Sequence, residues 1–132
     1  MNTETLLEYI LDNCTPDYGY YGLPVFTIDG EDVAIARELK EAEEAAKEYI
    51  KDSVWAFNAS FLASHIANLD EEDIDSIRGD RCEDANPALL KLIDDFDAFA
   101  KEAIATDGLG HFLATYDGEE REIGDFLIFR IN

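Results

Sequence analysis

The side chains of this chain that could do chemistry are above all carboxylates. Its 132 residues hold 31 Asp and Glu against 10 Lys and Arg, which gives a formal net charge of -21 at pH 7. Four of the acids recur at spacings of three and four residues, which places them on one side of a helix: Glu41, Glu44, Glu48 and Asp52. The chemistry open to such a row is ion pairing with Lys and Arg side chains of another molecule.

A row of like charges on a helix is costly to the fold. Carboxylates three or four residues apart destabilise a helix by about 0.2–0.5 kcal/mol per pair. Glu48 and Asp52 also fall near the expected C-terminal end, where the helix dipole is already negative. This cost favours a functional interpretation, although solubility or adaptation to high salt would also produce an acidic surface.

A second dense group of acids lies between positions 70 and 75. It consists of Asp70, Glu71, Glu72, Asp73 and Asp75. Duplex DNA carries one phosphate charge per about 1.7 Å of its axis, so rows of carboxylates on a rigid support can imitate it. The two acidic groups therefore predict a nucleic-acid mimic, with these nine residues as the partner-binding site.

Other kinds of site find little support in the sequence. The two histidines, His65 and His111, and the two cysteines, Cys14 and Cys82, form no catalytic or zinc-binding signature. A calcium loop opening at position 70 would need glycine at its sixth position, where Asp75 stands. We therefore expect no enzymatic activity, no cofactor and no specific metal site.

Net charge and hydropathy exclude further partners. Direct nucleic-acid binding is not expected, because the few basic residues are dispersed among the acids and a polyanion would be repelled. No apolar stretch approaches the roughly 20 residues that span a bilayer, and the chain opens without a signal-peptide pattern. We expect a cytoplasmic protein without membrane contact.

The elements that must position these residues follow from the apolar periodicity. Helices are expected over residues 3–12, 38–52, 53–67 and 86–108, the last with Asn86 as N-cap, Pro87 at the first helical position and Gly108 as C-terminal cap. Residues 70–84 hold only two apolar side chains, and we expect a short helix or a loop there. A hairpin is expected around Asp29-Gly30, after a loop over residues 13–24. Strands are expected over residues 111–116, 119–123 and 126–131.

These elements predict a single domain over residues 1–132. Its fold class is α+β, with three to five helices packed on a small antiparallel sheet made of an N-terminal hairpin and a C-terminal β-meander. Hydrophobic residues make up 47% of the chain and aromatic residues 11%, which is enough to build a core beneath the acidic surface.

Two stretches resemble small uncharacterised proteins of phages and mobile elements. They are DSVWAFNASFLASHI at residues 52–66 and HFLATYDGEEREIGDFLIFRIN at residues 111–132. In size and charge alone, the chain also resembles phage DNA mimics that block restriction enzymes or CRISPR complexes. This resemblance implies a mobile-element origin and a site of action in the host cytoplasm, and it assigns no residue a role.

Two functions from different classes are the main candidates at this point, and an enzyme built on a pair of carboxylates stays open as a third, because 31 acids make any such pair unremarkable. The first is an acidic inhibitor that blocks the DNA- or RNA-binding channel of a basic host defence complex, either CRISPR or restriction. The second is an adaptor or assembly protein that binds a partner through an apolar, aromatic surface, with the charge serving only solvation. Tyr18, Tyr20 and Tyr21 would provide that surface. Partner binding by the acidic inhibitor should weaken as salt rises, whereas binding through an apolar surface should hold or tighten.

Overall fold

The structure is a computed structural model that describes residues 3–13 and 17–132. It divides into two compact units, one made of Met1–Ala46 with Thr106–Asn132 and the other of Lys47–Ala105. Two helices pass from one unit into the other, α2 (Leu39–Lys51) and α6 (Phe96–Asp107). The expected single domain stays a prediction, because compactness does not measure whether two units unfold together.

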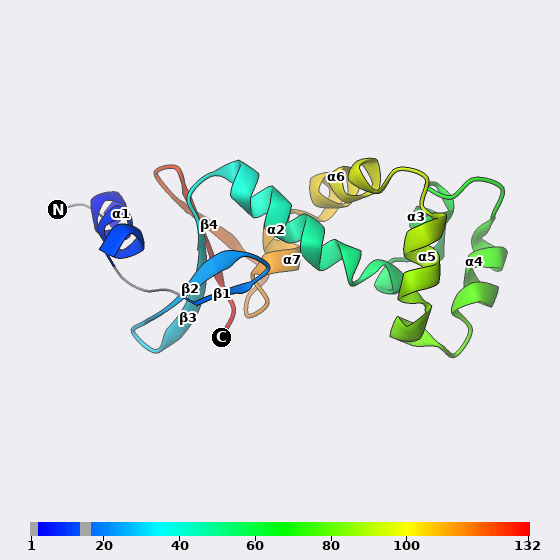
Figure 1. The fold of residues 1–132 in the computed structure, drawn as a ribbon, viewed down its shortest axis with the longest axis horizontal. Helices are drawn as coiled ribbons and strands as arrows, with labels where there is room; N and C mark the ends of the chain where they lie inside the picture. The colour runs from blue at the N-terminus through cyan, green and yellow to red at the C-terminus, as the bar shows by residue number, and fades with distance from the viewer. Residues whose placement is uncertain (1–2, 14–16) are drawn as a thin grey trace. The chain divides into compact units, whose positions relative to one another are not determined.

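The first unit is built on a five-stranded antiparallel sheet (Figure 1). Its strands are β1 (Asp17–Tyr20), β2 (Leu23–Ile28), β3 (Glu31–Ala36), β4 (Glu120–Ile123) and β5 (Phe126–Arg130), in the order β1-β2-β3-β5-β4. The hairpin β2–β3 turns at Asp29 and Gly30, whose φ angles of 52° and 80° fit the type I′ turn that matches strand twist. This confirms the hairpin that the sequence predicts.

The two central strands are buried on both faces of the sheet. Residues 33–36 of β3 and 126–129 of β5 are all buried, because helices cover the sheet from two sides. On one face Leu7 and Leu11 of α1 (Thr3–Asn13) pack with Val33, Ile35 and Phe126. The short helix α7 (Leu109–Leu113) lies on the other side of the sheet from α1 (Figure 1).

The second unit is helical. It holds the end of α2, then η1 (Val54–Ala56), α3 (Ala59–Ala63), α4 (Glu71–Arg78), η2 (Cys82–Ala85), α5 (Asn86–Leu92) and most of α6. Its core centres on Phe99, a fully buried ring. The rings of Phe57 and Phe61 lie 5.0 Å from that ring, edge to face, and His65 lies 5.1 Å from it. Such contacts add to the hydrophobic stabilisation of the core.

Two of the predicted long helices are divided in the structure. Residues 53–67 form η1 and α3 instead of one helix, because the side chain of Asn58 caps α3 by accepting the N–H of Phe61 at 3.0 Å. Residues 86–107 form α5 and α6, separated at Ile93, where the backbone is extended. Asp95 then starts α6 by accepting the N–H of Ala98 at 3.2 Å.

The predicted capping role of Asn86 is wrong. Asn86 is the first residue of α5, Ala85 is its N-cap, and no side chain caps the helix. The amide of Asn86 instead donates to the carbonyl of Lys51 at 2.9 Å and accepts the N–H of Trp55 at 3.1 Å. It therefore ties the end of α2 to η1.

The predicted strand over residues 111–116 is also wrong, since residues 109–113 form α7. A short apolar run cannot be assigned to helix or strand by periodicity alone. Gly108 directly follows α6, as predicted, but its ψ of 156° lies outside the αL range of a left-handed C-terminal cap, and it is the N-cap residue of α7. The loop expected over residues 13–24 instead contains β1 and the start of β2.

The predicted fold class is confirmed. The described residues form seven α-helices and a five-stranded antiparallel sheet that contains the N-terminal hairpin and the C-terminal strands, an α+β fold. The helices are shorter and more numerous than the three to five expected, because local caps divide the longer apolar patterns.

Candidate acidic interface

The row on α2 borders the buried face of the helix. Ala42, Ala46 and Ile50 are buried on the side away from Glu44, and Ala45 is buried next to Glu41, so the Glu44 side of the row faces outward. Of the four predicted carboxylates, Glu44 and Glu48 are exposed and Glu41 is half-buried. Asp52 is exposed and lies one residue beyond the helix. α2 belongs to both units, which divide between Ala46 and Lys47.

These carboxylates are not neutralised by the basic residues of their own helix. Within the part of the chain that the structure describes, no ion pair includes Glu41, Glu44, Glu48 or Asp52. Lys47, which directly precedes Glu48, contacts the carboxylate of Asp97 on α6 instead. The row therefore keeps its mutual repulsion, and Glu48 in the last turn of α2 also opposes the dipole.

The second acidic group has a local structural role that the sequence interpretation missed. Asp70 and Asp73 form a reciprocal capping box, in which each carboxylate accepts the backbone N–H of the other residue, at 2.9 and 3.1 Å. Glu71 and Glu72 lie in the first turn of α4, where the helix dipole favours negative charge. These acids therefore stabilise the helix that carries them.

Asp75 is also engaged within the unit. Its carboxylate forms an ion pair with Arg78 at 2.9 Å. The guanidinium of Arg78 donates as well to the backbone carbonyls of Trp55 and Phe57. The end of α4 is thereby fastened to η1, and Asp75 is less available to a partner than its exposure suggests.

The two predicted groups thus differ in their relation to the fold. Asp70, Asp73 and Asp75 have intramolecular hydrogen-bond partners, whereas the exposed Glu44 and Glu48 have none among the described residues. Folding explains the first group and does not explain the second. Glu44 and Glu48 are therefore the strongest candidates for contact with another molecule.

The tyrosines proposed for an apolar interface are partly used by the fold. Tyr20 and Tyr21 are half-buried, and their rings meet edge to face at 5.1 Å. The hydroxyl of Tyr20 donates to the carbonyl of Leu113 at 2.7 Å, which joins β1 to α7. The side chain of Tyr18 lies outside the residues whose side chains are described.

The described histidines and cysteine are each placed within their own unit. Nε2 of His65 lies 2.7 Å from Oε2 of Glu102, and its ring packs on the aromatic core. His111 is exposed on α7, Cys82 is exposed, and Cys14 lies outside the described residues. Over residues 3–13 and 17–132 no group of three or more His, Cys, Asp or Glu is arranged to hold a metal ion. None of the described helices has the length and apolar character needed to cross a bilayer.

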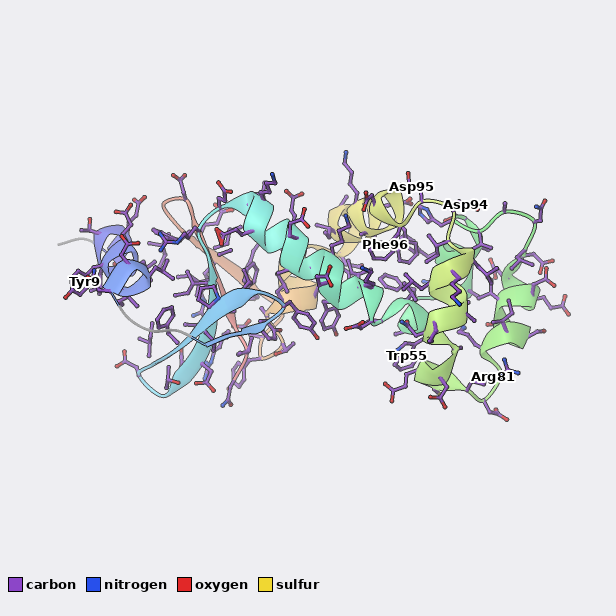
Figure 2. The ribbon with its side chains drawn as sticks, in the orientation of Figure 1. Tyr9, Trp55, Arg81, Asp94, Asp95 and Phe96 are labelled. Atoms are coloured by element: carbon purple, nitrogen blue, oxygen red, sulfur yellow. The ribbon has the colours of Figure 1, made fainter. Side chains whose placement is uncertain are left out.

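Two surface grooves were not anticipated from the sequence. One, of about 500 Å³, lies in the first unit between the start of α2 and the β4–β5 turn; it is lined by Arg37, Glu38, Leu39, Glu122, Gly124, Asp125 and Leu127. The other, of about 530 Å³, lies in the second unit and includes Trp55 and Arg78, with Trp55 labelled in Figure 2. Neither groove is visible in the sequence pattern, because the lining residues come from segments far apart along the chain.

Comparisons of this chain with protein-family models, with curated proteins and with solved structures find no match.

Proposed function

We propose that this chain is a non-enzymatic acidic inhibitor that imitates a nucleic acid. Its target is the DNA- or RNA-binding channel of a basic host defence complex, either a CRISPR complex or a restriction enzyme. Glu44 and Glu48 pair with Lys and Arg of that channel, and Glu41, Asp52 and the acids at positions 70–75 add to the negative potential. No cofactor is needed, because no bond is made or broken.

One observation carries this proposal: the exposed carboxylates of α2 have no ion-pair partner among the described residues and weaken their own helix. Successive members of the row, three or four residues apart, rise about 4.5–6 Å along the helix axis. That spacing is wider than the phosphate spacing of duplex DNA, so α2 alone supplies only part of the charge density. In this proposal the acids at positions 70–75 supply the rest of the charge.

Displacement of a labelled duplex from a purified restriction enzyme or CRISPR complex tests the proposal. The wild-type chain is expected to release the duplex, with an effect that weakens steeply as salt rises. The double variant Glu44→Gln, Glu48→Gln is expected to bind about tenfold more weakly. Each of the two exposed ion pairs that it loses is worth about 0.7 kcal/mol, and tenfold in affinity corresponds to about 1.4 kcal/mol.

A matched control removes the same charge from elsewhere. Glu8→Gln with Glu119→Gln neutralises two exposed acids outside both predicted groups, and it should bind as the wild type does. Both variants should keep a free energy of unfolding within about 1 kcal/mol of wild type, because each repulsion removed on α2 is worth only about 0.2–0.5 kcal/mol and exposed substitutions usually change stability little. Equal displacement by both variants across the salt range would remove α2 from the mechanism.

The adaptor hypothesis predicts the opposite salt response in the same assay. An apolar interface holds or tightens as salt rises. Among the described side chains, Tyr20 is already bonded to Leu113, so the tyrosine surface supports this alternative less than the α2 row supports mimicry.

A further inference from the structure

The groove of about 530 Å³ in the second unit joins an aromatic ring to charged side chains. It is lined by Trp55 and Ala56 of η1, Asp75 and Arg78 of α4, and Gly79 and Cys82 after it. All six residues belong to the second unit, so the groove is a property of that unit alone.

The backbone of Trp55 is held from two directions. Its N–H donates to the side-chain oxygen of Asn86 at 3.1 Å, and its carbonyl accepts from Nη1 of Arg78 at 3.1 Å. The side chain is half-buried, and within the described part of the chain its ring stacks on no other aromatic ring. Because the backbone that carries the ring is held and the side chain is half-buried, a ligand that packs against the ring orders less of the chain than it would at a free loop.

The charges around the groove favour a cation. The guanidinium of Arg78 is already balanced, because it contacts Asp75 and two backbone carbonyls and is only 21% exposed. The exposed segment that follows carries Asp80, Glu83 and Asp84 against Arg81, which is labelled with Trp55 in Figure 2. A phosphate or carboxylate would be repelled there, whereas a cation would be attracted.

We propose that this groove binds an arginine side chain presented by the basic partner. The indole of tryptophan is the best cation–π acceptor among side chains, and guanidinium stacks on aromatic faces with less dehydration than ammonium. This inference rests on the proposed function for the nature of the partner. The groove would add a contact of a different kind from the ion pairs of the acidic row, because Trp55 is an uncharged aromatic side chain.

A fluorescent hexa-arginine peptide is the probe, and its binding is measured by anisotropy. Trp55→Ala is expected to weaken binding by about 3- to 10-fold, the range of a partly desolvated cation–π contact, and Trp55→Phe by less. Tyr9→Ala is the matched control, because it removes an aromatic ring that is 58% exposed in the first unit and leaves the net charge unchanged. It should bind the peptide as the wild type does.

Trp55 also reports the contact directly, since it is the only tryptophan of the chain. Its fluorescence in the wild type should change saturably with hexa-arginine, less with hexa-lysine, and not with an uncharged hexa-citrulline peptide. Equal binding by Trp55→Ala and Tyr9→Ala, with no change in Trp55 fluorescence, would overturn the inference. Circular dichroism of Trp55→Phe establishes that the unit is folded in a variant that keeps an aromatic ring.

The outcomes separate this inference from the proposed function. If Glu44→Gln, Glu48→Gln loses duplex displacement while Trp55→Ala binds hexa-arginine normally, the acidic row acts and the groove does not. If Trp55→Ala weakens hexa-arginine binding while Glu44→Gln, Glu48→Gln displaces the duplex as well as its control does, the groove binds arginine and the acidic row does not act.

Discussion

Gly110 of α7 is the position at which a single methyl group should be most damaging. The Cβ of an alanine there would lie 2.7 Å from both the backbone nitrogen of Glu120 and the carbonyl oxygen of Gly118. Ordinary contacts between non-bonded heavy atoms lie at about 3.5–4.0 Å. Because both contacted atoms belong to the backbone, no side-chain rotation can relieve the overlap.

The magnitude follows from the packing of α7. Its residues Leu109, Phe112 and Leu113 are buried, so moving the helix away from the chain before β4 disturbs the core of the first unit. Overpacking of a core costs about 1–3 kcal/mol or more, and a rigid backbone contact lies at the upper end. Alanine gains about 1 kcal/mol over glycine in a helix, so Gly110→Ala should lose about 2 kcal/mol of unfolding free energy in total.

Urea denaturation followed by circular dichroism measures this loss. Thermal denaturation should show a melting temperature lower by about 5–10 °C. Trp55 fluorescence follows the second unit in the same samples, so the two probes show whether the units unfold together. His111→Ala, one residue along α7 and exposed, is the control and should stay within about 0.5 kcal/mol of wild type. A Gly110→Ala protein as stable as wild type, or more stable, would refute the close approach of α7 to β4.

Two further predictions concern side chains that link distant segments. Asn86→Ala removes the hydrogen bonds to Lys51 and Trp55 and should lower the free energy of unfolding by about 1–3 kcal/mol. Ser76→Ala, at an exposed position on α4, is the control and should leave it unchanged. Equal urea midpoints for the two variants would contradict a stabilising role of the Asn86 hydrogen bonds. Hydrogen bonds from Thr27 and then Asn132 lower the pKa of Asp32 below its ordinary 3.8, so this carboxylate stabilises the fold above that pH and ceases to as pH falls through the lowered value. Asp32→Ala should therefore be less stable than wild type at neutral pH, and the difference should shrink as the pH falls below 3.8; a difference that does not change with pH would count against it.

Some elements could be predicted because their signals are local. The Asp29-Gly30 turn requires two positive φ angles, which these residue types tolerate, and the hairpin follows from that alone. The acidic side of α2 follows from spacing, since a helix places residues three and four apart on one face. The buried alanines at positions 42, 45 and 46 recur at helical spacing and mark the face of α2 that packs inward.

Other elements depended on contacts between segments far apart in the sequence. The residues of α7 match strand and helix equally, and the close approach that Gly110 permits to the chain before β4 is a tertiary contact. The apolar pattern over residues 86–107 continues through Ile93, but the N–H of Asp94 bonds to the carbonyl of His65 at 3.0 Å, where the two helices separate. A hydrogen bond between residues so far apart in the sequence cannot be predicted from local periodicity.

The same division holds for the candidate site. The sequence by itself determined the charge, its patterning on α2 and the class of partner that would be attracted, because charge and helical spacing are properties of the residues. Only the tertiary structure decided that the carboxylate of Asp97 on α6 pairs with Lys47 on α2. It also decided that Trp55 and Arg78 share a groove, because burial and pairing depend on which segments the folded chain brings together.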